Sequence, residues 1–226
     1  MLIRNWMTRE VITVTPETSM LKASKLMKEH DIRRLPVIDS ENHVVGIVSD
    51  RDIKDASPSK ATTLDMHELY YLLSELKIKS IMTPHPTTVS PTDTVETVAM
   101  LMEERGFGGI PVVDDDGKLV GIISDHDVFK VLISITGVRQ GGVQLAFNVP
   151  DKTGSMRPIL DALRLNHASI ISILSSNDST ELGTRHVFIR LRPMETAAED
   201  ALITVFKEQF NLLYWARNAV HLTEKS

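Results

Sequence analysis

Apolar positions along the chain recur first at helical spacing and then in short continuous runs. Two sets repeat every three to four residues and would each form the buried face of a helix: Met20, Ala23, Met27 and Val95, Val98, Met102. Each set is followed by two apolar runs, RLPVID with HVVGIVS and GIPVVD with KLVGIIS. Their connections carry turn residues, and Asp-Gly suits a turn that needs positive φ. The pattern predicts a helix and a hairpin, twice.

Helix start signals frame each copy. Thr15-Pro16 and Ser90-Pro91 place a capping side chain before proline, a combination typical of the first turn of a helix. Ser49 and Ser124 follow the second strand of each hairpin and predict the N-cap of another helix.

The two halves are copies of one another. An offset of 75 positions, the distance from Gly46 to Gly121, aligns them without a gap. GIVSDRD at 46–52 then falls on GIISDHD at 121–127. This tandem duplication predicts domains at 1–56 and 78–133, joined by a linker at 57–77. The linker should form a helix that packs on the repeats, because Asp65 and Glu68 make a capping box and one face is apolar: Met66, Leu69, Tyr70, Leu73, Leu76.

After the second copy the pattern changes. The glycine-rich GVRQGG predicts a flexible hinge at 134–141. Residues 142–226 alternate as strand, helix, strand, strand, helix and strand, with Pro158 tolerated in the first turn of the first helix. That βαββαβ order is ferredoxin-like, so the expected fold class is α/β (α+β) throughout.

Composition and charge narrow the functional classes. The 226 residues are 42% hydrophobic and 24% charged, typical of a globular protein, and the net charge of −5 argues against nucleic-acid binding. No cysteine is present, which excludes disulfides and thiolate chemistry. No apolar run reaches the roughly 20 residues of a membrane span, and the first residues lack a signal peptide, so we expect a cytoplasmic protein.

Catalytic and metal motifs are not visible. The eight histidines are scattered without a ligand pair, no G-x-S-x-G occurs, and DDDG at 114–117 suits a hairpin turn better than a calcium loop. GFGG at 106–109 precedes a strand rather than a helix, unlike a nucleotide-binding glycine loop. We therefore expect no catalytic residues, no metal and no bound cofactor.

The repeated Ser-x-x-Asp has two interpretations. Ser49 with Asp52, and Ser124 with Asp127, could simply cap a helix. The same groups could instead bind a nucleotide, with the helix N-terminus and serine near a phosphate and the carboxylate accepting from a ribose diol. Neighbouring cationic side chains would add positive charge in this interpretation: Arg51, His126.

A difference between the copies favours binding. Arg33 and Arg34 precede the first LPVI strand, whereas Gly108 and Gly109 occupy the matching positions. Surface arginines are commonly solvated, but this pairing predicts two unequal sites, with the site around Asp52 more favourable for anions. The glycines would allow a ligand or backbone to approach closely.

The duplicated motif resembles a tandem pair of CBS domains, a Bateman module, over residues 1 to about 133. The resemblance implies adenosine-containing ligands in clefts between the halves: AMP, ADP, ATP or S-adenosylmethionine. It assigns ribose to Asp52 and Asp127, and phosphate to Ser49, Ser124, Arg33 and Arg34. Thr13, Thr88 and Gly109 complete the expected nucleotide-binding set.

The remaining chain resembles an ACT domain. VPDKTGSM contains the Asp-x-x-Gly turn of that family, and the resemblance implies an amino-acid site at Asp151 and Gly154. A CBS pair followed by an ACT domain is similar to the acetoin-utilisation AcuB-like proteins. The resemblance implies a regulatory, homodimeric protein linked to acetoin or acetate metabolism.

Two hypotheses remain open. The first is a ligand-sensing regulatory protein without catalysis of its own. The alternative is an interaction module whose CBS and ACT domains serve only assembly, with Ser-x-x-Asp acting as a helix cap. An enzyme ranks third.

Overall fold

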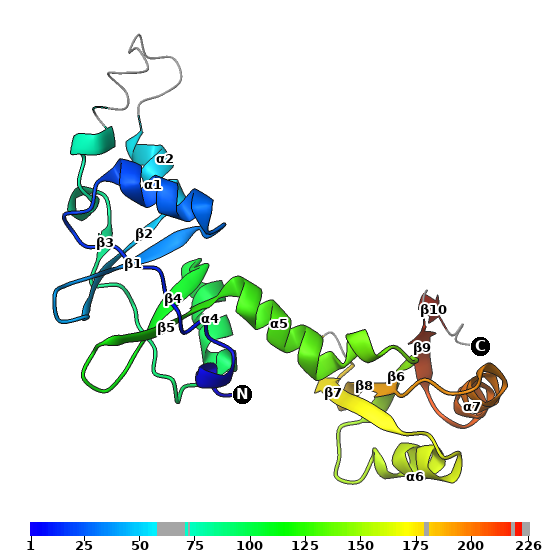
Figure 1. Cartoon of the computed structure of the whole chain (residues 1–226). Helices are drawn as coiled ribbons and strands as arrows, with labels where there is room; N and C mark the ends of the chain where they lie inside the picture. Colours follow the sequence, from blue (N-terminus) through cyan, green and yellow to red (C-terminus); the bar gives the residue numbers. More distant parts are fainter. Residues whose placement is uncertain (58–70, 72, 179–180, 218–219, 223–226) are drawn as a thin grey trace. The chain divides into compact units, whose positions relative to one another are not determined.

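The computed structural model describes residues 1–57, 71, 73–178, 181–217 and 220–222 (Figure 1). The chain forms two compact units, Met1–Phe129 and Lys130–Ser226, which we describe separately. The capping box predicted at Asp65 and Glu68 lies outside the described residues. Leu73 and Leu76, from the end of the linker, pack against the core of the first repeat.

The N-terminal unit contains both copies of the repeat. The first copy consists of α1 Met20–Glu29, β1 Arg34–Ile38, β2 Val44–Ser49 and α2 Asp50–Ala56. The second consists of α4 Val95–Arg105, β4 Gly109–Val113, β5 Leu119–Ser124 and α5 Asp125–Thr136. A short element, η1 Ile3–Asn5, precedes the first copy, and two others, η2 Ile78–Ser80 and β3 Thr83–Pro84, precede the second. The helix-hairpin-helix order predicted for each copy is confirmed.

The first helices begin later than predicted. Ser19 caps α1, its side chain accepting from the Lys22 N–H, and Thr94 caps α4 in the same way. The Thr15-Pro16 and Ser90-Pro91 signals instead form turns that precede the helices. The prediction was wrong because a second hydroxyl residue lies within one turn of each proline, and it takes the N-cap position.

The hairpins and helix faces match the sequence pattern. β1 pairs with β2 and β4 with β5, both antiparallel. Gly117 has φ +80°, as its Asp-Gly turn requires. The predicted helix faces are buried, each residue at most 8% exposed: Met20, Ala23, Met27, Val95, Val98, Met102.

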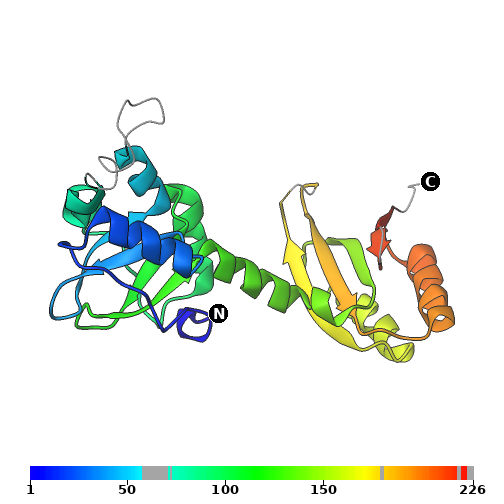
Figure 2. The same cartoon turned by 45° about the horizontal axis from the view of Figure 1, so that its top comes forward.

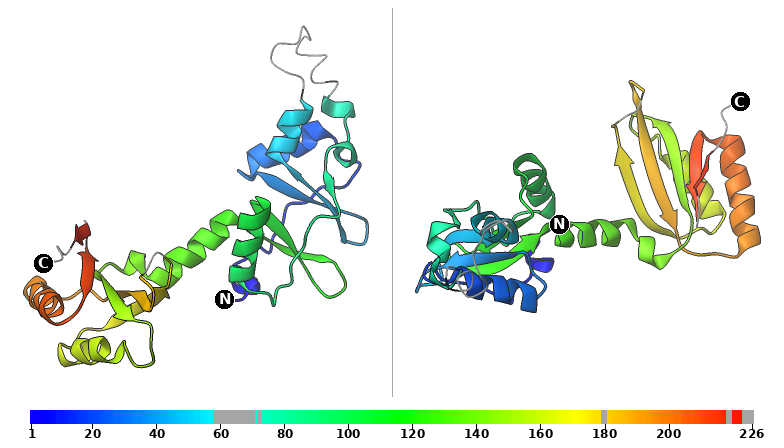
Figure 3. Two further views of the ribbon diagram at one scale, coloured as in Figure 1. Left: turned by 180° about the vertical axis from the view of Figure 1, so that it is seen from behind. Right: turned by 90° about the horizontal axis from the view of Figure 1, so that it is seen from above.

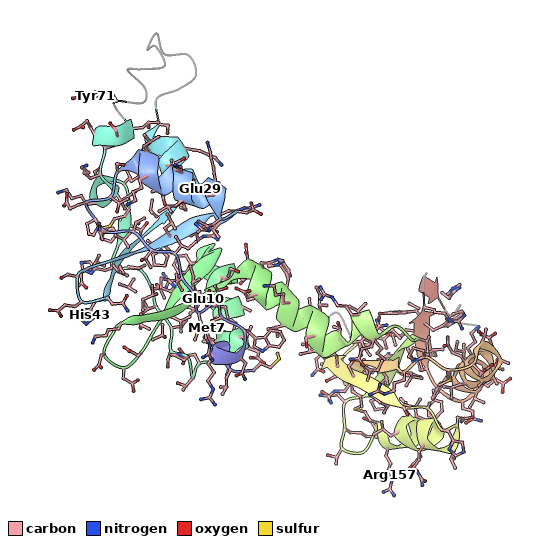
Figure 4. All side chains as sticks on the ribbon, viewed as in Figure 1. Met7, Glu10, Glu29, His43, Tyr71 and Arg157 are labelled. Atoms are coloured by element: carbon pink, nitrogen blue, oxygen red, sulfur yellow. The ribbon has the colours of Figure 1, made fainter. Side chains whose placement is uncertain are left out.

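Each repeat also receives a segment from the other. Thr83 in β3 pairs with Ile47 in β2, and Thr8 forms the corresponding bridge with Ile122 in β5. Met7 lies beside the second hairpin (Figure 4), where a Cβ on Gly121 would lie 2.6 Å from its Sδ. A Cβ on Gly46 would lie 2.4 Å from Sδ of Met82. Gly46 and Gly121, the first residues of the two repeated motifs, thus leave room for the segment that each repeat receives from the other.

The C-terminal unit is an antiparallel sheet with helices on one face (Figures 2 and 3). The strand order is β10-β9-β6-β8-β7, in which β9, β6, β8 and β7 give the ferredoxin-like arrangement. The order βαββαβ predicted from the sequence is confirmed, with β10 added. The elements are β6 Gln144–Pro150, α6 Arg157–Leu165, β7 Ile170–Ser176, β8 Thr184–Leu191, α7 Thr196–Gln209, β9 Leu212–Ala216 and β10 Val220–Leu222.

One core joins this sheet to its helices. Ile159 and Leu163 of α6 and Phe206 of α7 pack with Leu145 and Phe147 of β6, all at most 1% exposed. Helix α7 also buries Glu199. Its carboxylate accepts hydrogen bonds from Nε and Nη2 of Arg217, and the bond from Nε is 2.7 Å long. Burial of that carboxylate therefore depends on a cation that follows β9.

The segment expected to be a hinge is regularly folded where it is described. Helix α5 continues to Thr136, and η3 follows at Val138–Gln140. The carbonyl of Thr136 accepts from Ser172 Oγ at 2.9 Å and from Arg190 Nε at 3.1 Å. The division between compact units falls at Phe129, within α5. Hinge motion at 134–141 stays a prediction.

Candidate functional site

The two Ser-x-x-Asp motifs form helix caps. In the first, the N–H and hydroxyl of Ser49 both donate to Asp52 Oδ2 at 2.7 Å, and the Asp52 N–H donates back to the serine oxygen. Ser124 and Asp127 make the same three bonds, at 2.7 to 3.4 Å. The capping interpretation is therefore correct for both copies. Any ligand at Ser49 would have to share groups that already stabilise α2.

A cavity of about 630 Å³ lies beside the first motif, within the N-terminal unit. That volume is in the range of small-molecule sites. The first repeat contributes Arg33, Arg34, Ser49, Arg51 and Asp52 to its wall, and the second contributes residues around β3 and the start of β4, including Gly109. Six residues predicted from the sequence are thereby brought together. The cavity exists because the two repeats exchange segments, which puts β3 against β2.

The cavity carries a small excess of positive charge, because four cationic side chains line it with three carboxylates: Arg33, Arg34, Arg51 and Lys54 with Asp50, Asp52 and Asp55. Within the described part of the chain, the side chains of Arg33 and Arg51 make no hydrogen bond or ion pair. Asp50 is paired, accepting from Lys54 Nζ at 2.7 Å. The hydrogen bond from Lys54, with further attraction from the charges of Arg33 and Arg34, lowers the pKa of Asp50 below its usual value. The arginines therefore create a field that stabilises anions.

Arg34 reaches the second repeat. Its Nη1 donates to the carbonyl oxygen of Gly108 at 2.7 Å. A Cβ on Gly108 would lie 1.7 Å from Nη2, and one on Gly109 would lie 3.3 Å from Cδ of the same side chain. We expected these glycines to make room for a ligand or backbone, and the group they accommodate is the Arg34 side chain.

The second copy of the motif lies elsewhere. Ser124, His126 and Asp127 do not line this cavity, and neither do Thr13 and Thr88. Asp127 is only 4% exposed, whereas Asp52 is half-buried and faces the cavity. The two acids, equivalent in sequence, thus differ in access. Ligand binding by these five residues stays a prediction.

Several lining residues were missed by sequence analysis. His85, Phe107 and Lys54 contribute to the wall, as do Thr83 and Thr87. His85 and its neighbours follow β3, and their place in the cavity depends on pairing with the other repeat. No local periodicity signals that pairing. Lys54 was predictable, because it lies four residues after Asp50 on the same helical face.

A second cavity, of about 450 Å³, lies in the C-terminal unit. Its wall includes Asp151 and Gly154, the residues of the Asp-x-x-Gly turn, together with Lys152 and Arg185. Arg185 Nε lies 3.1 Å from Asp151 Oδ1, and Asn177 Nδ2 donates to Asp151 Oδ2 at 3.2 Å. One carboxylate and two cations therefore line this cavity, Asp151 and Lys152 from the turn and Arg185 from β8.

Other classes of site find no support in the described residues. Among them, no three histidine, aspartate or glutamate side chains gather as a metal site would need. No helix in the described ranges is long and apolar enough to cross a bilayer.

Comparisons with known proteins agree with the duplicated architecture. The CBS domain family matches residues 3–59 and 78–134. A CBS domain-containing protein of Dictyostelium discoideum is 31% identical over 134 residues, which cover 59% of this chain and 92% of that protein. Among solved structures, CBSX2 of Arabidopsis thaliana in complex with AMP is 34% identical, with a TM-score of 0.50 over 60% of this chain and 98% of that one.

A further similarity concerns AcuB of Vibrio cholerae, whose name refers to acetoin utilization. The two are 29% identical, with a TM-score of 0.52 over 62% of this chain and 95% of that chain. The family match, the gapless repeat and the paired hairpins all lead to one assignment. The chain belongs to the CBS domain family and carries two CBS domains in tandem, the regulatory pair called a Bateman module.

Proposed function

We propose that the protein senses an adenosine-containing nucleotide, which binds in the cavity between the two CBS domains. The observation that carries the proposal is the cavity itself, which Asp52 lines together with Arg33, Arg34 and Arg51. A carboxylate beside several guanidinium groups suits a ligand that has both a diol and phosphates. The AMP complex of CBSX2 supports this choice.

The charges favour particular ligands. Arg33 and Arg51 lack protein partners among the described residues, and a phosphate would supply them. S-adenosylmethionine carries a sulfonium cation, which these guanidinium groups would repel. We therefore expect AMP, ADP or ATP to bind more tightly than S-adenosylmethionine. Ser49, already engaged in the cap, would contribute less to phosphate binding than the arginines.

The regulatory output is also part of the proposal. We expect a cytoplasmic homodimer without catalysis of its own, controlling acetoin- or acetate-linked metabolism as its similarity to AcuB suggests. Phe129 and Leu132 of α5 are 59% and 51% exposed and lie three residues apart on the helix. Such an apolar strip supports association with a second copy.

A calorimetric titration tests the proposal. AMP, ADP, ATP and S-adenosylmethionine should be titrated into the wild-type protein and into Asp52→Ala. Hydrogen bonds to a charged acceptor contribute roughly 1.5–3 kcal/mol each, so loss of the ribose contacts should weaken AMP binding by at least about tenfold. Absence of binding by all four compounds would favour the alternative, a module that serves only assembly.

A second binding function concerns the C-terminal unit. We propose that this unit is an ACT domain and that the cavity at Asp151 and Gly154 takes an amino acid. Asp151 would pair with an ammonium group, and Arg185 with a carboxylate. Titration with the twenty amino acids tests this, with Asp151→Asn as the control variant. Failure of all twenty would leave the unit with an assembly role.

A further inference from the structure

The carbonyl oxygen of Gly108 accepts two hydrogen bonds. One comes from Arg34 Nη1, at 2.7 Å, and the other from the backbone N–H of Asp125, at 3.2 Å. Asp125 is the first residue of α5. A single acceptor thus connects a cation of the first repeat with the start of the last helix of the second repeat.

The internal repeat provides a comparison for this contact. The equivalent backbone bond in the first copy runs from the N–H of Asp50 to the carbonyl of Arg33, at 2.9 Å. That carbonyl receives no guanidinium from the other repeat, because glycine stands at 109 where the first copy has Arg34. Of these two equivalent backbone bonds, only the one at the start of α5 shares its carbonyl acceptor with a cationic side chain.

Two further features make this contact specific. Arg34 can take this position only beside a glycine, since a Cβ on residue 108 would lie 1.7 Å from Arg34 Nη2 and would displace the guanidinium. Arg34 also lines the nucleotide cavity, and its guanidinium has five N–H donors, of which Gly108 uses one. The same side chain can therefore donate to a ligand phosphate and to Gly108 at once.

Helix α5 extends beyond the CBS pair. It runs from Asp125 to Thr136, across the division at Phe129 between the two compact units. Its last residue, Thr136, accepts hydrogen bonds from Ser172 and Arg190 of the C-terminal sheet. Thr136 itself belongs to the C-terminal unit, so α5 begins in one compact unit and ends in the other.

We propose that Arg34 couples a phosphate in the cavity to the start of α5. The inference rests on the proposed nucleotide function and assigns its regulation to one side chain. A phosphate that binds Arg34 fixes the guanidinium against Gly108, which keeps the Gly108 carbonyl aimed at the N–H of Asp125 and makes opening of that backbone bond rarer. A ligand without a phosphate leaves this contact as it is.

Amide exchange of Asp125, followed by NMR on the full chain, tests the coupling. Saturating AMP should slow this exchange by about tenfold, the effect of one charge-assisted hydrogen bond, and adenosine by less than about threefold. Arg34→Met and Arg33→Met each remove one charge from the cavity, but only the first removes the contact with Gly108. We expect slowing at saturating AMP to be lost in Arg34→Met and retained in Arg33→Met.

A second variant breaks the contact without removing the charge. In Gly108→Ala the new methyl group displaces the flexible end of Arg34, so saturating AMP should no longer slow exchange at Asp125. Slowing that persists in Arg34→Met or Gly108→Ala, or adenosine acting as strongly as AMP, would overturn the coupling. Calorimetry separates the two proposals, because AMP binding without any change at Asp125 refutes only the coupling, whereas no binding of AMP, ADP or ATP refutes both.

Discussion

Asp52 and Asp127 make the same cap in the two repeats but differ in access to the cavity, so their alanine variants separate stability from binding. Asp52→Ala and Asp127→Ala each remove two hydrogen bonds donated by a serine to Oδ2. Loss of a capping side chain typically costs ~1 kcal/mol, within a range of about 0.5–2. Asp127 is 4% exposed, so water can replace its lost hydrogen bonds less readily than at half-buried Asp52, and its removal should cost more.

The binding effects should run in the opposite order. Asp52 faces the cavity, so its replacement should weaken AMP binding by at least about tenfold, whereas Asp127→Ala should change it by less than about threefold. Scanning calorimetry measures the first property. Each kcal/mol corresponds to a shift of about 2–4 °C in a chain of this size. Isothermal titration measures the second.

Two results would refute this reasoning. Equal loss of AMP affinity in both variants would mean that the ligand uses the second motif as well. Full affinity in Asp52→Ala would mean that its carboxylate only caps α2, and that the arginines bind the nucleotide without it.

Three further predictions concern stability. Gly46→Ala places a methyl group against Met82 and should lower the free energy of unfolding, measured in urea, by about 1–3 kcal/mol. A neutral effect would contradict the close packing at this glycine. The pKa of Asp39 lies below its usual 3.8, mainly because the backbone N–H of His43 donates to the carboxylate. The ionised carboxylate therefore stabilises the turn above a pH of about 3.8, and this stability is lost as the pH falls through the lowered pKa. An NMR titration of the His43 amide should show this transition, which Asp39→Asn should abolish. Arg217→Met leaves the buried carboxylate of Glu199 unpaired and should lower the thermal midpoint more than Arg217→Lys does, and an equal effect would mean that charge is unimportant there.

Much of the fold was predictable from local patterns. Helical spacing at Met20, Ala23 and Met27 identified a buried face, and Asp-Gly at 116–117 identified a hairpin. The capping box at Ser49 and Asp52 was readable because four consecutive residues contain all of it. The helix starts were misjudged by a few residues, because two hydroxyl side chains competed for one cap.

Most of the cavity was not predictable. Arg33, Arg34, Arg51 and Asp52 could be identified from their chemistry and the repeat, but the wall that faces them comes from the other copy. Contact between Arg34 and Gly108 joins residues 74 positions apart and leaves no periodic pattern. The burial of Asp127 was hidden for the same reason, since its sequence neighbours match those of Asp52.

The exchange of segments at Thr8 and Thr83 means that neither CBS domain has a complete hairpin edge of its own. A single repeat in isolation would satisfy this pairing only by lending its first segment to another copy of itself and receiving that copy's segment in return. The duplicated chain therefore corresponds to a reciprocal dimer joined by a covalent linker. Damage to either half removes a paired segment from the other, so both should be lost in one cooperative step.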